Sequence, residues 1–228
     1  MQGLILKIDC PDQHGIVAKI ASYVADHEAN LCEFSQFTDD EHSKFFARVE
    51  IDTRDLNVSL EDFISGFKPL GQSLSASWHF REMPYQMRTA VLVTKTDHCL
   101  NEILWRTKLG EMPIKITSVI GNRDNCQKIA EQAGIPFHHI NLDGDNRETG
   151  FQEIKKILSD ENVELTVLAR FMQILPTWFC DEYTGKIINI HHSFLPAFIG
   201  ANPYRQAHER GVKLIGATCH YVTSELDG

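Results

Sequence analysis

The chain has 228 residues, of which 43% are hydrophobic, with a formal net charge of −9 and a pI of about 5.6. This length allows one large domain or two ordinary ones, and the acidic balance without any run of Lys or Arg argues against a nucleic-acid partner. No apolar stretch has the length of a membrane span and the N-terminus lacks a signal peptide, so we expect no membrane partner and a cytoplasmic location.

The first eighty residues alternate strand and helix patterns. We expect strands at 3–10, 29–39, 44–52 and 74–82, and helices at 12–28 and 59–71. The order β-α-β-β-α-β is that of a ferredoxin-like domain, an antiparallel sheet with both helices on one face. We therefore expect a first domain over residues 1–82.

The stretch "CPDQHGIVAKIASYVADHEANLCEFSQFTD" resembles the opening of an ACT domain, a small regulatory module. The resemblance implies a small amino-acid effector near Asp12, Gly15 and Asn30. Gly15 suits such a site, because a tight turn before a helix exposes backbone N–H groups to a carboxylate. Alternatively, Asp12 only caps the helix and Asn30 only ends it. ACT domains usually pair edge to edge, which implies a homodimer or a higher homo-oligomer.

Residues 83–89 carry a proline and little pattern, and we expect them to form a linker. The remainder alternates strand and helix units. We expect strands at 90–95, 114–122, 135–142, 163–171, 186–191 and 214–222, and helices at 97–110, 123–134, 150–162 and 175–185. Repeated units of this kind predict a Rossmann-like α/β domain over residues 90–228, with a mostly parallel sheet between two helical layers.

Polar residues follow the last two predicted strands of this domain. Asn189 and His191 end one strand, and the other carries His220 and leads to Asp227. Ligands of doubly wound sheets bind beyond the carboxyl ends of the strands, so we expect both segments at one rim.

These two segments resemble the folate-dependent formyltransferases, whose patterns are N-x-H-x-S-x-L-P and G-x-T-x-H-x-V with an aspartate seven residues after the histidine. The matching residues are Asn189, His191, Ser193, Leu195, Pro196, Gly216, Thr218, His220, Val222 and Asp227. With the ACT-like half, the resemblance covers nearly the whole chain and is closest to the 10-formyltetrahydrofolate deformylase family. It implies a hydrolase that releases formate and tetrahydrofolate for purine and one-carbon metabolism.

The resemblance also implies roles for individual residues. Asn189 and His191 would donate hydrogen bonds to the oxyanion that forms at the formyl carbon, and Asp227 would orient water and relay a proton. His220 would support Asp227 or the loop, and Ser193 would be a further supporting residue; no G-x-S-x-G surrounds Ser193, so it is not a nucleophile. The alternative for His191 is an ordinary buried histidine at a strand end.

The family places the pterin ring of the folate against the segment that follows a central strand. Here that segment is Met172, Gln173, Ile174 and Leu175, although Ile174 could instead pack the core. We expect no cofactor and no metal. His138 and His139 are adjacent on a strand, so their side chains point to opposite faces and cannot easily share one ion. The six cysteines form no CxxC, and we expect reduced core thiols rather than a disulfide or zinc framework.

The segment after the first strand of the second domain bears on the formyl acceptor. No glycine lies between Thr94 and Leu109, whereas a phosphorylated amine needs a glycine-rich cradle of backbone amides. This departure favours water as the acceptor; Asp97 would cap the following helix, and His98 is a weak site candidate. The open alternatives are a transformylase with an amine acceptor and a non-catalytic amino-acid sensor. The sequence stops at Gly228, one residue beyond Asp227, so we expect the C-terminal part of the family's domain to be missing.

Overall fold

The structure, a computed structural model, describes residues 3–191 and 203–225. The chain divides into two compact units, Met1–Tyr85 and Gln86–Gly228, and each unit has its own hydrophobic core. One unit contains an antiparallel sheet and the other a mostly parallel one, which confirms the predicted α/β fold class. The predicted site residues Ser193 and Asp227 lie outside the described residues.

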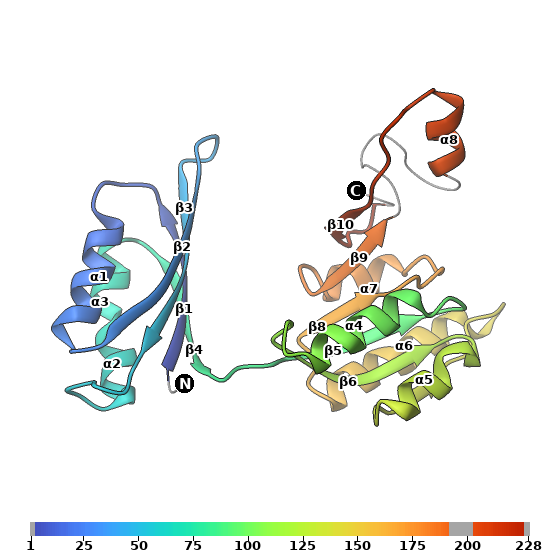
Figure 1. Cartoon of the computed structure of the whole chain (residues 1–228), viewed down its shortest axis with the longest axis horizontal. Helices are drawn as coiled ribbons and strands as arrows, with labels where there is room; N and C mark the ends of the chain where they lie inside the picture. Colours follow the sequence, from blue (N-terminus) through green and yellow to red (C-terminus); the bar gives the residue numbers. More distant parts are fainter. Residues whose placement is uncertain (1–2, 192–202, 226–228) are drawn as a thin grey trace. The chain divides into compact units, whose positions relative to one another are not determined.

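The first unit is a four-stranded antiparallel sheet covered on one face by helices (Figure 1). Its elements are β1 (Gly3–Pro11), α1 (Ile16–Asp26), β2 (Asn30–Asp39), β3 (Lys44–Asp52), α2 (Leu60–Gly66), α3 (Lys68–Ser73) and β4 (Ser77–Met83). The strand order β2-β3-β1-β4 is the ferredoxin-like arrangement that the sequence predicts.

Alternation and helical spacing create the core of this unit. Ile16, Ile20 and Val24 form the buried stripe of α1, while every second residue of β1 and β3 points to the same core. One difference from expectation concerns residues 59–71, which form two helices instead of one. Pro69 explains the break, because proline cannot donate the hydrogen bond to the preceding turn that a continuous helix requires.

The second unit is a six-stranded sheet with the order β10-β9-β8-β5-β6-β7. Its strands are β5 (Met87–Val93), β6 (Ile114–Gly121), β7 (Phe137–His139), β8 (Leu165–Leu168), β9 (Ile187–His191) and β10 (Thr218–Tyr221). Its helices are α4 (His98–Lys108), η1 (Asp124–Cys126), α5 (Gln127–Gln132), α6 (Asn146–Asp160), α7 (Thr177–Glu182) and α8 (Pro203–Glu209). The chain runs from β5 outward to β7 and then crosses to β8, so the strand order reverses between β5 and β8.

Alternate residues of β5 point to opposite faces of the sheet, and each face packs against its own helices. Ala90 and Leu92 pack with residues of α6 and α7, whereas Val91 and Val93 pack with residues of α4 and α5. Because both faces are buried, β5 carries an almost continuous apolar run, as expected for a central parallel strand.

Several strands differ from their expected form, and β7 spans only Phe137–His139 rather than residues 135–142. β5 begins at Met87 rather than at residue 90, and β8 spans four residues rather than nine. β10 spans only Thr218–Tyr221 and pairs antiparallel with β9, whereas the other pairs in this sheet are parallel.

Not all of the cysteines are core thiols. Cys10, Cys126 and Cys180 are buried, but Cys32 and Cys219 are exposed. Burial raises the pKa of the Cys126 and Cys180 thiols, which keeps them protonated at neutral pH. In the described parts of the chain, no helix combines the length and the apolar character needed to cross a membrane.

Candidate active site

Asn189 and His220 meet across the antiparallel pair β9–β10. They are register partners, and the Asn189 side-chain nitrogen lies 3.3 Å from His220 Nε2. The sequence predicts both residues at one rim, and the structure brings them into direct contact although they lie 31 residues apart.

The surroundings of His220 determine which of its ring nitrogens carries the proton. His220 Nδ1 lies 3.1 Å from the carbonyl oxygen of Tyr221, and a carbonyl can only accept a hydrogen bond. Nδ1 is therefore the protonated nitrogen, and in the neutral ring Nε2 is an acceptor. The Asn189 amide consequently donates one N–H to His220, which fixes its orientation and leaves its second N–H for another acceptor.

His191 ends β9 two residues after Asn189 and is 6% exposed. Its register partner in β10 is Thr218. Burial of this imidazole beside the Asn189–His220 pair gives two side chains with N–H donors at the same strand end. Such donors stabilise developing negative charge most effectively where water is excluded.

The segment Met172–Leu175 follows β8 next to the point where strand order reverses. The side chains of Met172 and Ile174 are 60% and 65% exposed, while Leu175 is buried in the core. Ile174 is therefore not a core residue, which removes the alternative considered for it. Just before the segment, Arg170 has φ of 60°, a left-handed conformation that turns the chain out of β8.

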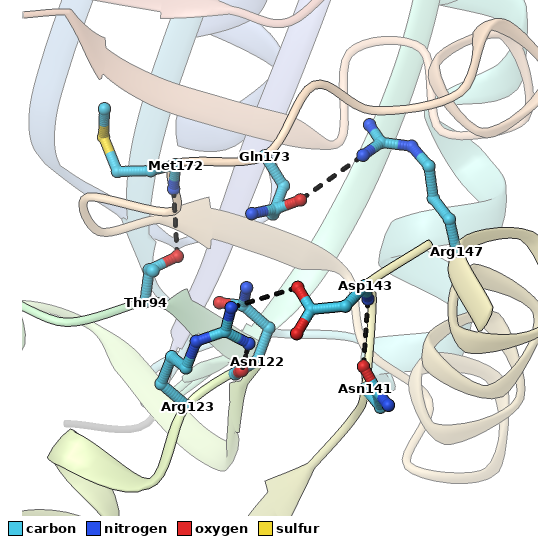
Figure 2. A network of polar contacts seen from close by, with 8 residues as sticks. All are labelled: Thr94, Asn122, Arg123, Asn141, Asp143, Arg147, Met172 and Gln173. Carbon is cyan, nitrogen blue, oxygen red and sulfur yellow. Dashed lines mark hydrogen bonds and ion pairs between the residues drawn. The ribbon is translucent and has the colours of Figure 1, made fainter. Parts of the chain in front are cut away.

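Two side chains that the sequence did not single out hold this segment (Figure 2). Thr94, directly after β5, accepts a hydrogen bond from the Met172 N–H at 3.0 Å. Arg147, in the first turn of α6, lies 3.3 Å from Gln173 Oε1 and also donates to the Ile174 carbonyl. No local pattern marks these residues, because both contacts join elements that are distant in sequence.

The ends of β6 and β7 form a separate polar cluster on the same rim. Arg123 pairs with Asp143 at 3.0 Å, and its hydrogen bonds lower the pKa of the Asp143 carboxyl. An open cavity of about 590 Å³ lies here, lined by Arg123, Asp124, Asn125, His139, Asn141 and Asp143. None of the residues predicted to bind folate lines this cavity.

His138 and His139 have different partners. His138 Nε2 lies 3.4 Å from Glu161 Oε1, and His139 Nδ1 lies 2.8 Å from Asp124 Oδ1. Their side chains thus point to different sides of β7, as adjacent strand residues should.

The predicted effector turn of the first unit has the geometry of a glycine-capped helix start. Gly15 occupies the N-cap of α1 with φ of 85°, and no side chain caps this helix. Asp12 therefore does not cap α1; its backbone N–H instead donates to the Ser43 carbonyl at 2.9 Å. Asn30 is the first residue of β2 and is exposed.

The segment between β5 and α4 has no helix-capping side chain. Asp97 holds the N-cap position of α4, as predicted, but its carboxylate makes no capping hydrogen bond.

Comparison with known proteins gives a consistent family. A formyl transferase family model matches residues 87–228. The formyltetrahydrofolate deformylases of Bacillus subtilis (strain 168) and of Synechocystis are 40% and 42% identical to this chain over 97% of its length. The chain spans 74% and 78% of those two relatives.

Solved structures agree with the sequence comparison. A crystal structure of a formyltetrahydrofolate deformylase from Pseudomonas syringae matches the whole chain with a TM-score of 0.92 and 40% identity, and the match covers 76% of that protein. A phosphoribosylglycinamide formyltransferase from Anaplasma phagocytophilum matches 63% of the chain and 68% of its own length, with a TM-score of 0.57 and 35% identity. The match to both units, at this identity, shows that the chain belongs to the formyltetrahydrofolate deformylase family.

Proposed function

We propose that the protein hydrolyses 10-formyltetrahydrofolate, with Asn189 and His191 stabilising the oxyanion and Asp227 handling the proton. As water adds to the formyl carbon, it gives a proton to the Asp227 carboxylate, a C–O bond forms, and negative charge develops on the former carbonyl oxygen. The C–N10 bond then breaks, Asp227 returns the proton to N10, and formate and tetrahydrofolate leave. The observation that carries this proposal is the Asn189–His220 contact beside the buried His191, within a chain of this family.

The geometry of Asn189 supports its role as an oxyanion donor. Its amide is oriented by His220, so the free N–H is held in one position instead of rotating between two. A preorganised donor costs no reorganisation during the reaction, and removal of one such donor commonly costs about 10²–10³ in kcat.

The folate would lie against Met172–Leu175. The exposed side chains of Met172 and Ile174 offer apolar contact to a flat ring. Among the described residues, Gln173 and Leu175 form no backbone–backbone hydrogen bond, and their N–H and carbonyl groups would meet the pterin edge.

Water is the acceptor that the second unit suits best. The segment from Thr94 to Asp97, between β5 and α4, contains no glycine and so lacks the flexible backbone that wraps a phosphate. A small amino acid bound near Asp12, Gly15 and Asn30 would regulate the enzyme, and the first units of two chains would pair in a homo-oligomer.

The test is formate release by the full-length protein from 10-formyltetrahydrofolate alone, beside an Asp227→Asn variant. We expect formate from the wild type and almost none from the variant, because the amide cannot accept a proton. Turnover only after addition of an amine would instead indicate a transformylase. Binding of an amino acid without any turnover would indicate a sensor.

A further inference from the structure

A buried hydroxyl occupies the end of the central strand of the second unit. Thr94 follows β5 directly and is 6% exposed. β5 lies between β6 and β8 in the sheet. From β5 the chain adds β6 and β7 on one side and then β8 and β9 on the other. Thr94 is thus at the reversal of strand order, where doubly wound sheets bind their ligands.

This hydroxyl makes one long-range hydrogen bond, to the backbone of the predicted folate segment. Thr94 Oγ1 accepts from the Met172 N–H at 3.0 Å across 78 residues of sequence (Figure 2). The Met172 side chain is 60% exposed, so its backbone is fixed from below while its side chain faces outward. The segment belongs to no strand, so no neighbouring strand offers a carbonyl to the Met172 N–H. Without Thr94, this N–H would lose the acceptor that the structure gives it.

Thr94 is suited to fix a position because its own conformation is restricted. A β-branched side chain has few χ1 rotamers, and burial removes the remaining freedom. Arg147 also contacts the segment, at Gln173 Oε1 and at the Ile174 carbonyl, through a longer side chain with more rotatable bonds. Thr94 supplies the short and conformationally restricted contact, at the first residue of the segment.

We propose that Thr94 is a positioning residue for folate binding: it holds the backbone of Met172–Leu175 where the pterin edge meets it. This inference rests on the proposed function insofar as that segment receives the folate. It also means that the Met172 N–H donates its hydrogen bond to Thr94 and not to the ligand. The pterin must then take its hydrogen bonds from the groups that follow, beginning with the Met172 carbonyl.

The direct test replaces Thr94 with valine, which keeps the shape but lacks the acceptor. The Met172 N–H would then face a methyl group, and we expect tetrahydrofolate to bind roughly tenfold more weakly. KM for 10-formyltetrahydrofolate should rise by a similar factor, with kcat changed by less than about twofold, because uniform binding is lost rather than transition-state binding. Thr94→Ser retains the hydroxyl and should restore affinity to near the wild-type value.

Thr89 offers a matched control on the same strand. It is fully buried, and its hydroxyl donates to the Met87 carbonyl at 3.0 Å, at the opposite end of β5. Thr89→Val removes the same group from the same strand without touching the folate segment. We expect it to lower the melting temperature about as much as Thr94→Val while leaving the affinity for tetrahydrofolate unchanged.

Amide hydrogen exchange at Met172 tests the positioning without any turnover. The wild-type amide should exchange slowly and the Thr94→Val amide faster, which separates this inference from the proposed hydrolysis. Slow Met172 exchange and weaker tetrahydrofolate binding in Thr94→Val would support it even if no formate is released. A rapidly exchanging Met172 in the wild type, equal affinities of Thr94→Val and wild type, or an equal loss in Thr89→Val would overturn it.

Discussion

His220 orients Asn189 through an acceptor that exists only in the neutral imidazole. Its Nδ1–H donates a hydrogen bond to the Tyr221 carbonyl, so Nε2 accepts one from the Asn189 side-chain amide. In this arrangement Asn189 would touch the substrate, whereas His220 would act only through Asn189. Substitutions of the two residues should therefore lower kcat by different amounts.

The first prediction concerns Asn189. Asn189→Ala removes the proposed oxyanion donor, and we expect kcat for formate release to fall about 10²–10³-fold with little change in KM. Steady-state kinetics on the full-length protein would measure this. Asn101→Ala, which truncates an exposed asparagine on α4, is the matched control and should be unaffected. A loss of less than threefold in Asn189→Ala would exclude the amide from the reaction.

The second prediction concerns its support. His220→Ala leaves Asn189 in place but free to rotate, so we expect a smaller loss in kcat, about tenfold, equivalent to one hydrogen bond. His220→Gln retains an acceptor and should recover part of the activity. His208→Ala, on an exposed histidine of α8, serves as the control. A loss as large as that of Asn189→Ala would mean that His220 contacts the reacting atoms itself.

Sequence reasoning reached these residues because they lie in a local pattern around each strand end. It did not reach Thr94 or Arg147, although both hold the segment predicted to bind folate. Their contacts form only when β5, α6 and the segment after β8 come together in the fold. The spacing of residues along the chain does not predict such contacts.

At the scale of elements, the existence of the strands was predictable, but their lengths and the antiparallel direction of β10 were not. The apolar run at 163–171 predicts one long strand, yet β8 spans only Leu165–Leu168. Arg170 then takes a left-handed conformation, which no hydrophobic pattern signals. β10 runs antiparallel to β9, and α8, which lies between them in sequence, stands apart from the sheet (Figure 1). Of the described side chains of α8, only Ala207 is buried.

The turn at Arg170 gives the third prediction. Arg170→Gly and Arg170→Ala both truncate the side chain, but only glycine adopts φ of 60° without steric cost. We expect the glycine variant to be more stable than the alanine variant by about 1 kcal/mol, the reverse of their order within helices. Denaturant unfolding would measure the difference. Equal stabilities, or a more stable alanine variant, would show that the left-handed turn is absent in solution.

The end of β3 gives the fourth prediction, on pH. Arg54 donates from Nε to both Asp52 carboxylate oxygens, at 3.0 and 2.9 Å, and these hydrogen bonds lower the pKa of Asp52 below its ordinary 3.8. A carboxyl whose pKa is lowered by folding stabilises the fold above its unfolded pKa, and this contribution disappears as pH falls through the folded pKa. Arg54→Gln should therefore destabilise the protein at pH 7.

The pH profile of unfolding tests this pair. The difference between wild type and Arg54→Gln should be constant from about pH 6 to 8 and shrink as the pH drops below about 4. Lys19→Gln removes the same charge from an exposed site on α1 and should show no such profile. A difference that persists undiminished in acid would mean that Arg54 acts through packing rather than through the Asp52 charge.

At the scale of the whole molecule, each unit buries its own core. The first packs around residues such as Phe63 and Phe67, and the second around Leu92 and Phe151. The sequence predicted this division from the change in element order, because the βαββαβ pattern and the repeated βα units demand different sheets. The sequence predicted Asn189 and His220 at one rim, but their pairing across β9 and β10 required the fold itself.

The fifth prediction follows from the two cores. A fragment of residues 1–85 should fold alone into the four-stranded sheet, with a cooperative thermal transition and dispersed amide resonances. A Phe63→Ala version, which opens a cavity in that core, should lose about 3–5 kcal/mol and serves as the sensitive comparison. A wild-type fragment that remains unfolded would show that the first unit depends on the second.

We propose water, and not an amine, as the acceptor of the formyl group. Full-length protein would be incubated with 10-formyltetrahydrofolate in water enriched in ¹⁸O, with no amine present, and the formate analysed by mass spectrometry. We expect formate that carries one ¹⁸O atom per turnover, because the attacking water supplies one of its two oxygens. No formate without an amine, with formylated amine appearing once an amine acceptor is added, would contradict this.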